Sequence, residues 1–180
     1  MRRHFAVVCL AGLLAVGMGL VIGCGQSPSG DSNGDTDKST SAAPASSGPE
    51  AAVHAFLEGA RSGNDEGVTS MLTAKARTEL AKREIWVAPK CSDTARFVVG
   101  QVQYPQPSIA HVASRWIEVD PSTGEEYPAD MTWVLRKEVE GWRIGGMAMS
   151  VFEGEPPLLL NFEDPDDMLA QKQQLQAEIA

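Results

Sequence analysis

Apolar residues recur every three or four positions between residues 49 and 84, which is the spacing of helices that bury one face. Three short helices are predicted, over residues 49–62, 65–72 and 73–84. Pro49 suits the first turn of the first helix, where a backbone N–H would have no partner. Gly63 ends this helix, and Pro89 prevents any helix beyond residue 88.

From residue 94 the apolar period becomes two, as in strands that bury one face. Four strands are predicted, over residues 94–104, 109–119, 131–139 and 141–151. The apolar phase shifts across Gly100, which predicts a bulge. A polar loop over residues 120–130 separates the middle strands, and a tight turn at Gly141 joins the last two. This order predicts an α+β fold, with three N-terminal helices packed on a curved antiparallel sheet of about four strands.

Several segments of this region resemble a known family. The helix end "FLEGARSGN" and the hairpin "KEVEGWRI" resemble SnoaL-like, or nuclear-transport-factor-like, domains. The segments "HVASRW", "WVLRKEVEGWRIGGM" and "NFEDPDDM" look like a group of bacterial lipoproteins that carry such a domain. The resemblance covers about residues 50–167 and implies a cone-shaped roll. It implies that Trp142 and Ile144 fill the concave side of the sheet, that Gly141 makes the turn, and that Arg143 points outward.

The resemblance does not decide the function, because cone-fold families include enzymes, small-ligand binders and interaction domains. Isomerases and cyclases of this fold place an Asp or His base with Tyr or Asp donors inside the cone, and that set does not map onto this chain. His54, beside Val53 on the first helix, and His111, among apolar residues on a strand, are the candidates for a base. A single histidine is more often a hydrogen-bonded or partly exposed side chain.

Tryptophan and methionine are the other residues of interest in the folded region. They are Trp86, Trp116, Trp133, Trp142, Met131, Met147 and Met149. These side chains suit an apolar pocket, but the core of the sheet is the more common place for them. The chain has no HExxH motif, no Cys or His pair at ligand spacing and no glycine-rich phosphate loop in its folded region, so neither a metal nor a cofactor is predicted.

The C-terminal segment begins with an apolar run, Leu158 to Leu160 and Phe162, that is too short to cross a membrane. We expect it to cover part of the domain or to dock on a partner. A helix is predicted from Asp164, which caps it, to the end of the chain. Its apolar stripe is thin and consists of Met168, Leu175 and Ile179. Packing on the same chain is favoured; a protein partner or self-association is the alternative.

The N-terminal segment carries Arg2 and Arg3 and then an uncharged apolar run over residues 5–23, as in a secretory signal. The sequence "VIGC" that ends at Cys24 resembles the bacterial lipobox. The resemblance implies cleavage before Cys24, a thioether-linked diacylglycerol on its sulfur, and attachment to the membrane by two or three acyl chains. An uncleaved transmembrane anchor is the alternative, because the run approaches the length of a membrane span. Gly25 in place of Asp favours the outer membrane, facing the periplasm.

Residues 25–49 contain mainly Ser, Gly, Pro and small polar residues, which predicts a disordered linker. The predicted organisation is a signal peptide (1–23), a lipidated cysteine with its linker (24–49), a cone-fold domain (50–152) and a C-terminal extension with an amphipathic helix (153–180). Cys91 is the remaining cysteine once Cys9 leaves and Cys24 is lipidated, so no intrachain disulfide is expected.

The net charge of the chain argues against nucleic acid as a partner. Fifteen Lys and Arg stand against 24 Asp and Glu, a net charge of -9, which disfavours binding to nucleic acid. The sequence thus predicts a lipid-anchored protein of the cell envelope that binds a protein or a small ligand without catalysis. An isomerase- or cyclase-like enzyme that uses His54 or His111 is the alternative, and a spacer between membrane and wall is a third possibility.

Overall fold

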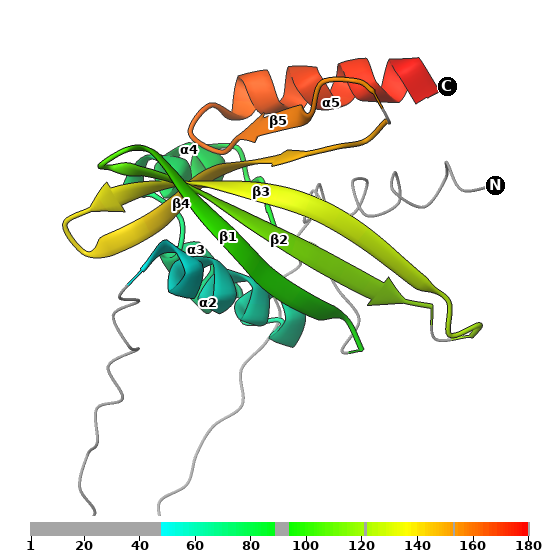
Figure 1. The fold of residues 1–180 in the computed structure, drawn as a ribbon. Helices are drawn as coiled ribbons and strands as arrows, with labels where there is room; N and C mark the ends of the chain where they lie inside the picture. Colours follow the sequence, from blue (N-terminus) through cyan, green and yellow to red (C-terminus); the bar gives the residue numbers. More distant parts are fainter. Residues whose placement is uncertain (1–47, 89–93, 121, 153, 180) are drawn as a thin grey trace, which may run out of the picture.

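The computed structural model describes residues 48–88, 94–120, 122–152 and 154–179. Three helices come first, and they are α2 (Pro49–Ser62), α3 (Asp65–Ser70) and α4 (Ala74–Lys82). Five strands follow, and they are β1 (Arg96–Gln106), β2 (Ile109–Val119), β3 (Glu126–Glu138), β4 (Gly141–Met149) and β5 (Leu158–Asn161). Helix α5 (Pro165–Ile179) comes last. The α+β arrangement agrees with the sequence pattern (Figure 1).

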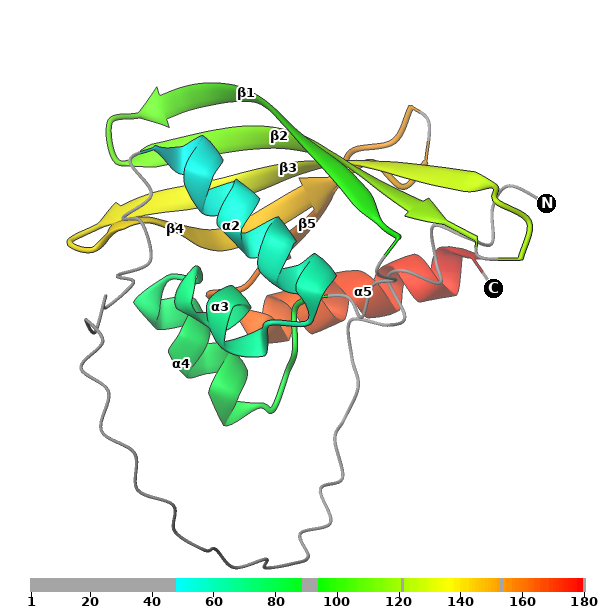
Figure 2. The same cartoon turned by 90° about the horizontal axis from the view of Figure 1, so that it is seen from below.

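The five strands form one antiparallel sheet in the order of the sequence, β1-β2-β3-β4-β5. Helix α2 lies across one face of this sheet, with α3, α4 and α5 beside it (Figure 2). We call the face that these helices cover the inner face and the opposite one the outer face. The register of β1 on β2 shifts between Val99 and Val102, so the bulge predicted at Gly100 is confirmed.

The hydrophobic core lies between the inner face and the helices. Phe56 of α2 is fully buried, and its ring lies 5.0 Å from that of Trp133 on β3. Burial of such a side chain stabilises the fold by about 1.5–3 kcal/mol. The rings of Phe97 and Trp116 are stacked at 6.0 Å. Trp116, Trp133 and most of the predicted tryptophans and methionines are buried here, so their assignment to the core is confirmed.

The sheet has one strand more than the four that the pattern predicts. Strand β5 lies in the apolar run of the C-terminal segment and pairs with β4, Leu160 opposite Met147 and Leu158 opposite Met149. Leu158 and Leu160 are buried whereas Leu159 is exposed. Because all three residues are leucine, their alternation between the two faces leaves no trace in the sequence.

The loop predicted over residues 120–130 is too long. Strand β3 begins at Glu126, which pairs with Val119, and the ladder continues without interruption. The ends of β2 and β3 that are joined by the loop after Val119 extend beyond the covering helices. Polar side chains such as Glu126 and Asp130 therefore occupy exposed positions of a regular strand. Polar composition alone therefore indicated a loop where the backbone forms a ladder.

The edge of β4 is covered in two different ways. Its C-terminal half pairs with β5, and its N-terminal half meets the segment between α3 and α4. Ile144 donates its N–H to the carbonyl of Met71 at 2.8 Å and accepts from the N–H of Thr73 at 2.9 Å. Gly146 lies where the pairing of β4 changes from the segment between α3 and α4 to β5. A Cβ at this position would lie 2.6 Å from the carbonyl oxygen of Leu160. Only glycine fits this close approach of two backbones.

The predicted outward position of Arg143 is wrong. The residue is 9% exposed, and its Nη1 donates to the carbonyl of Trp142 at 3.0 Å. The adjacent Ile144 pairs with the segment between α3 and α4, so this part of the strand is covered by chain. The predicted burial of Trp142 and Ile144 is confirmed.

Helix α5 packs on its own domain, as the sequence favoured. Its first turn is capped by Asp164, whose Oδ1 accepts from the N–H of Asp167 at 3.3 Å. Met168 and Leu175 are buried, and the helix lies against β5. Lys172 is also buried, which the sequence pattern does not predict, and this burial lowers the pKa of its ammonium group.

Candidate functional site

The outer face of the sheet carries an open groove of about 810 Å³, to which all five strands contribute. Residues in register form its floor, because Ala113 pairs with Thr132, Thr132 with Ala148, and Ala148 with Leu159. Gly100 extends the row onto β1, where a Cβ would lie 3.6 Å from that of Ala113. We call this line of Gly100, Ala113, Thr132, Ala148 and Leu159 the floor row. Four of its five side chains are small, and this makes the face hollow.

The two sides of the groove differ in chemistry. On one side Arg115 and Asp130 face each other on adjacent strands, with Nε to Oδ1 and Nη2 to Oδ2 both at 2.7 Å. The guanidinium holds the pKa of the Asp130 carboxyl below its usual range, and the carboxylate raises the pKa of Arg115. On the other side His111 lies opposite Val134. The charges that line the groove therefore form one balanced pair.

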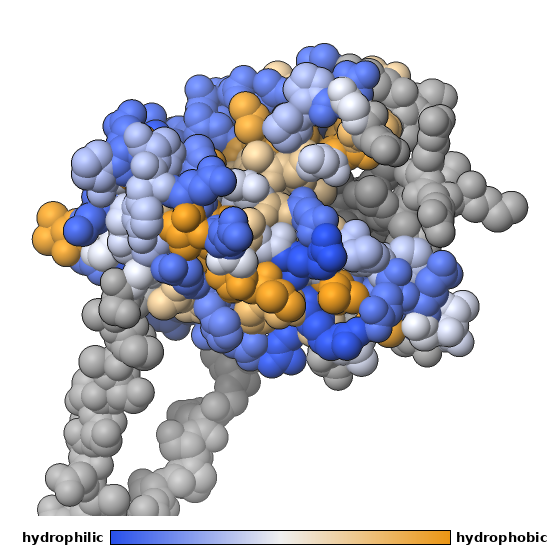
Figure 3. Space-filling view, in the orientation of Figure 1, coloured by the Kyte–Doolittle hydropathy of each residue, from blue (hydrophilic) through white to orange (hydrophobic). Residues whose placement is uncertain are grey.

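Apolar side chains stand exposed at both ends of the groove. Val98 on β1 is 62% exposed and Leu159 on β5 is 56% exposed. In the space-filling view, hydrophobic residues gather over the strands in the middle of the molecule, with hydrophilic residues around them (Figure 3). Large exposed apolar side chains that gather in a hollow are typical of binding surfaces rather than of an ordinary solvated face.

The structure places the two candidate histidines on different sides of the molecule. His111 is half-buried and lines the groove on the outer face. His54 is exposed on α2, and its ring makes an edge-to-face contact with the ring of Phe97, with 5.1 Å between the two ring centroids. The two side chains are not brought together, and neither belongs to the buried cluster on the inner face. A catalytic role for either residue stays a prediction.

The carboxylate that lines the groove is engaged by an arginine. A general base in an active site is usually oriented by a carboxylate or another acceptor. Asp130 is the carboxylate of the groove, and both of its oxygens accept from Arg115. Asp130 is therefore paired with Arg115 across the two strands.

The part of the chain that the structure describes contains no group of three or more His, Cys, Asp or Glu residues that could hold a metal ion. Within the same residues, no helix is long and apolar enough to cross a membrane. Cys24, Cys91 and the predicted linker up to residue 47 lie outside the described residues.

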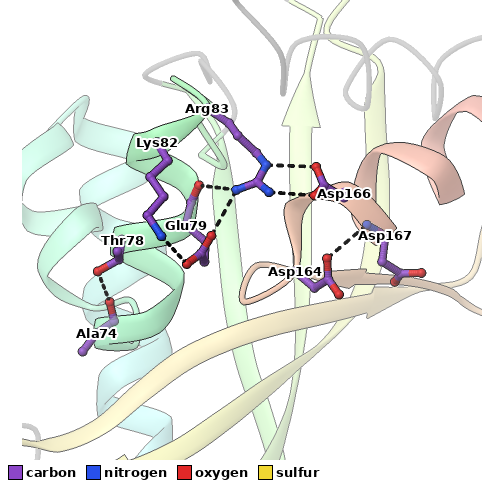
Figure 4. A network of polar contacts seen from close by, with 8 residues as sticks. All are labelled: Ala74, Thr78, Glu79, Lys82, Arg83, Asp164, Asp166 and Asp167. Carbon is purple, nitrogen blue, oxygen red and sulfur yellow. Dashed lines mark hydrogen bonds and ion pairs between the residues drawn. The ribbon is translucent and has the colours of Figure 1, made fainter.

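A network of polar side chains joins α4 to the first turn of α5 (Figure 4). Arg83 donates to Asp166 through Nε at 2.9 Å and Nη2 at 2.7 Å, and to Glu79 through Nη1 at 3.1 Å. Lys82 donates to the other oxygen of Glu79 at 2.8 Å. Hydrogen bonds from these cations hold the pKa values of Glu79 and Asp166 below their usual range. The network attaches a helix and is largely solvated, so it is a structural contact.

A buried polar cluster fixes the chain between β5 and α5. Glu163 is 9% exposed and accepts from the hydroxyl of the fully buried Thr73 at 2.9 Å. Arg136 on β3 donates its Nε to both carboxylate oxygens at 3.1 Å. These three residues come from distant parts of the sequence, so no local pattern predicts that they meet.

A second, smaller groove of about 310 Å³ lies between α5 and the connection from β4 to β5. Phe152, Leu158 and Leu175 line it, together with glutamines of α5. It shares Pro157 with the larger groove, so the two meet at the edge of the sheet.

Neither a protein-family model nor a curated protein sequence matches the chain. Two solved structures are similar to it. A ketosteroid isomerase-like protein from Erwinia carotovora atroseptica SCRI1043 is 21% identical with a TM-score of 0.39, and the match covers 57% of this chain and 92% of that one. An NTF-2 like protein of unknown function from Shewanella oneidensis MR-1 is 12% identical with a TM-score of 0.36, covering 52% of this chain and 88% of that one.

Proposed function

We propose that the chain is a lipid-anchored protein of the bacterial cell envelope whose domain binds a ligand or partner on the outer face of its sheet, without catalysis. The groove of about 810 Å³ is the observation that carries the binding role. It offers a hollow apolar floor with exposed Val98 and Leu159 at its ends, and its one carboxylate is engaged by Arg115.

In this proposal, a lipid on Cys24 attaches the protein to the membrane, after residues 1–23 have been removed as a signal peptide. Because helix α2 begins at Pro49, the tether that we propose ends before this residue; a chain of this length rich in Gly and Ser would have a root-mean-square span of roughly 25–30 Å. The domain is then held just off the membrane, in the periplasm at the outer membrane. Contact with the membrane comes from the lipid, and α5 is the surface proposed for a protein partner or for self-association.

The position of His111 in the groove supports one alternative, an enzyme that uses this imidazole as a base. A His111→Gln variant distinguishes the two functions. If the protein only binds, neither wild type nor the variant turns the ligand over; if His111 is a base, wild type turns the ligand over and the variant binds it without turnover.

Two measurements test the proposal. In the first, the producing cells are labelled with radioactive palmitate, and wild type, Cys24→Ser and the matched control Cys91→Ser are compared. We expect label and membrane association in wild type and Cys91→Ser, and neither in Cys24→Ser. A Cys24→Ser protein that stays in the membrane with its full unprocessed mass would support the transmembrane alternative instead.

The second measurement places a leucine-sized diazirine amino acid at position 159, in the groove, or at position 139, in the exposed turn between β3 and β4. Irradiation of intact cells should give adducts at position 159 and few at position 139. Equal yields at both positions would contradict a binding role for the outer face.

A further inference from the structure

We infer that the groove on the outer face binds the hydrocarbon chain of a lipid, extended across the five strands. This inference rests on the proposed binding role of the groove and names the chemical class of its ligand. The shape of the floor, the balance of charge and the continuation of the groove past the edge of the sheet lead to it.

The shape of the groove fits a chain. The floor row crosses five strands, and neighbouring strands lie about 4.8 Å apart, so the row is roughly 19 Å long. The flanking residues lie two positions away along each strand, so the two sides are about 13 Å apart at the backbone before their side chains narrow the gap. A saturated chain advances about 1.3 Å per carbon, which gives room for roughly 15 carbons.

Charge complementarity points to an uncharged occupant. Arg115 and Asp130 are the two fully charged side chains among the residues that line the groove, and they neutralise each other through two hydrogen bonds. A phosphate or an ammonium group would therefore meet no uncompensated charge of opposite sign among the residues that line the groove. A hydrocarbon chain leaves the pair intact and covers Val98 and Leu159, which are 62% and 56% exposed.

The groove continues beyond the sheet. At Pro157 it meets the smaller groove of about 310 Å³, whose walls include Phe152 and Leu175. A chain longer than the floor row therefore reaches a second hollow beside α5, whose walls combine Phe152 and Leu175 with the polar side chains of Glu155, Gln171 and Gln174. A compact ligand would have no use for this extension.

A second copy of the chain fits the groove poorly. In a symmetric pairing centred on the floor row, the hollow of one molecule would face the hollow of the other, because Ala113 and Ala148 would meet small residues again. No side chain would enter the floor, and stable interfaces are packed as densely as protein interiors.

The test uses the full lipid-anchored chain in phosphatidylcholine vesicles, with a 16-carbon fatty acid that carries a diazirine at mid-chain as the probe. After irradiation, mass spectrometry of the peptides locates the adducts. We expect them on the segments that contain Val98, Ala113 and Leu159. Unlabelled fatty acids of 8, 12 and 16 carbons compete with the probe. Each half-buried methylene should improve competition about twofold, half the free energy of the roughly fourfold effect of complete burial.

Two variants and one control make the test specific. Ala113→Phe fills the floor at an exposed position of β2, and Leu159→Lys places a charge at one end of the groove. Both should lower adduct yield at least tenfold. Val139→Phe, in the fully exposed turn after β3, is the matched control and should leave the yield unchanged. Circular dichroism shows which variants keep the fold. If Ala113→Phe does not fold, the adduct yield of Leu159→Lys provides the test.

Several outcomes would overturn the inference. Adducts that are as frequent in Ala113→Phe as in wild type, or competition that does not depend on chain length, would exclude a hydrocarbon site here. A dimer in sedimentation that Ala113→Phe breaks, without fatty-acid adducts, would assign the face to a second copy. Protein adducts at position 159 without lipid adducts would reject the lipid and keep the proposed binding role, whereas the absence of every adduct would reject both.

Discussion

Replacing Glu163 should weaken the fold at the junction of β5 and α5, by an amount that depends on what replaces it. The carboxylate accepts from the hydroxyl of Thr73 at 2.9 Å and from Nε of Arg136 at 3.1 Å. Thr73 is fully buried, whereas the side chain of Arg136 is 50% exposed. Loss of the carboxylate therefore leaves Thr73 without its acceptor, while water can replace the bond to Arg136.

The magnitudes follow from these exposures. Glu163→Gln keeps one oxygen for Thr73 and loses the charged bond to Arg136. A hydrogen bond to a charged group contributes about 1.5–3 kcal/mol, and the exposed arginine puts this loss at the lower end, about 1.5 kcal/mol. Glu163→Ala also leaves the O–H of the buried Thr73 without an acceptor, although its oxygen still accepts from Ala76; this adds about 1–3 kcal/mol, for a total of about 3 kcal/mol.

Urea unfolding of the full chain, followed by tryptophan fluorescence, measures the effect. With a slope of about 1.5 kcal/mol per molar urea, Glu163→Gln should lower the midpoint by roughly 1 M and Glu163→Ala by roughly 2 M. Glu58→Gln is the matched control, because Glu58 forms an exposed pair with Arg61 on α2 that contributes about 0.5 kcal/mol at most. Equal midpoints for Glu163→Gln and Glu58→Gln, or for the two Glu163 variants, would refute the reasoning.

Two further predictions concern the backbone and the attachment of α5. Gly146→Ala should destabilise the domain by about 1–3 kcal/mol, because the new Cβ would lie 2.6 Å from a backbone carbonyl, whereas Gly100→Ala, with its nearest contact at 3.4 Å, should be tolerated; similar urea midpoints would contradict this. Arg83→Gln should lower the midpoint at pH 7. Because Arg83 lowers the pKa of Asp166, the contribution of the pair is complete above about pH 4, the usual value of a carboxyl, and is lost as pH falls through the lowered pKa. The difference between Arg83→Gln and wild type should therefore shrink towards pH 3, and a constant difference would argue against it.

Local patterns predicted most of the helices and strands. Each of the three N-terminal helices has its own local start signal: Pro49 in the first turn of α2, and side-chain caps in α3 and α4, where the hydroxyl of Thr73 accepts from the N–H of Ala76. Burial on one face imposes the period of two on β2 and on most of β3, whereas β4 is buried on both faces over most of its length. Strand β5 was not predicted in this way, because three consecutive leucines show no alternation between apolar and polar residues.

The candidate site was much less predictable than the fold. The floor row joins residues of five strands, and their alignment depends on the register of each pair and on the bulge after Val99. On its own strand, Ala113 or Ala148 is an ordinary small residue. The sequence offers His111 as a candidate base, but only the register shows that it lines a groove on the outer face.

The sequence by itself determined what depends on neighbours along the chain: the helices and most strands, the acidic charge, and the expectation of a lipid on Cys24. The tertiary structure decided what depends on residues far apart: the fifth strand, the burial of Arg143, the cluster around Glu163 and the groove. The physical reason is that periodicity and capping act over a few residues, whereas register and close backbone approach, as at Gly146, involve segments that meet only in the folded chain.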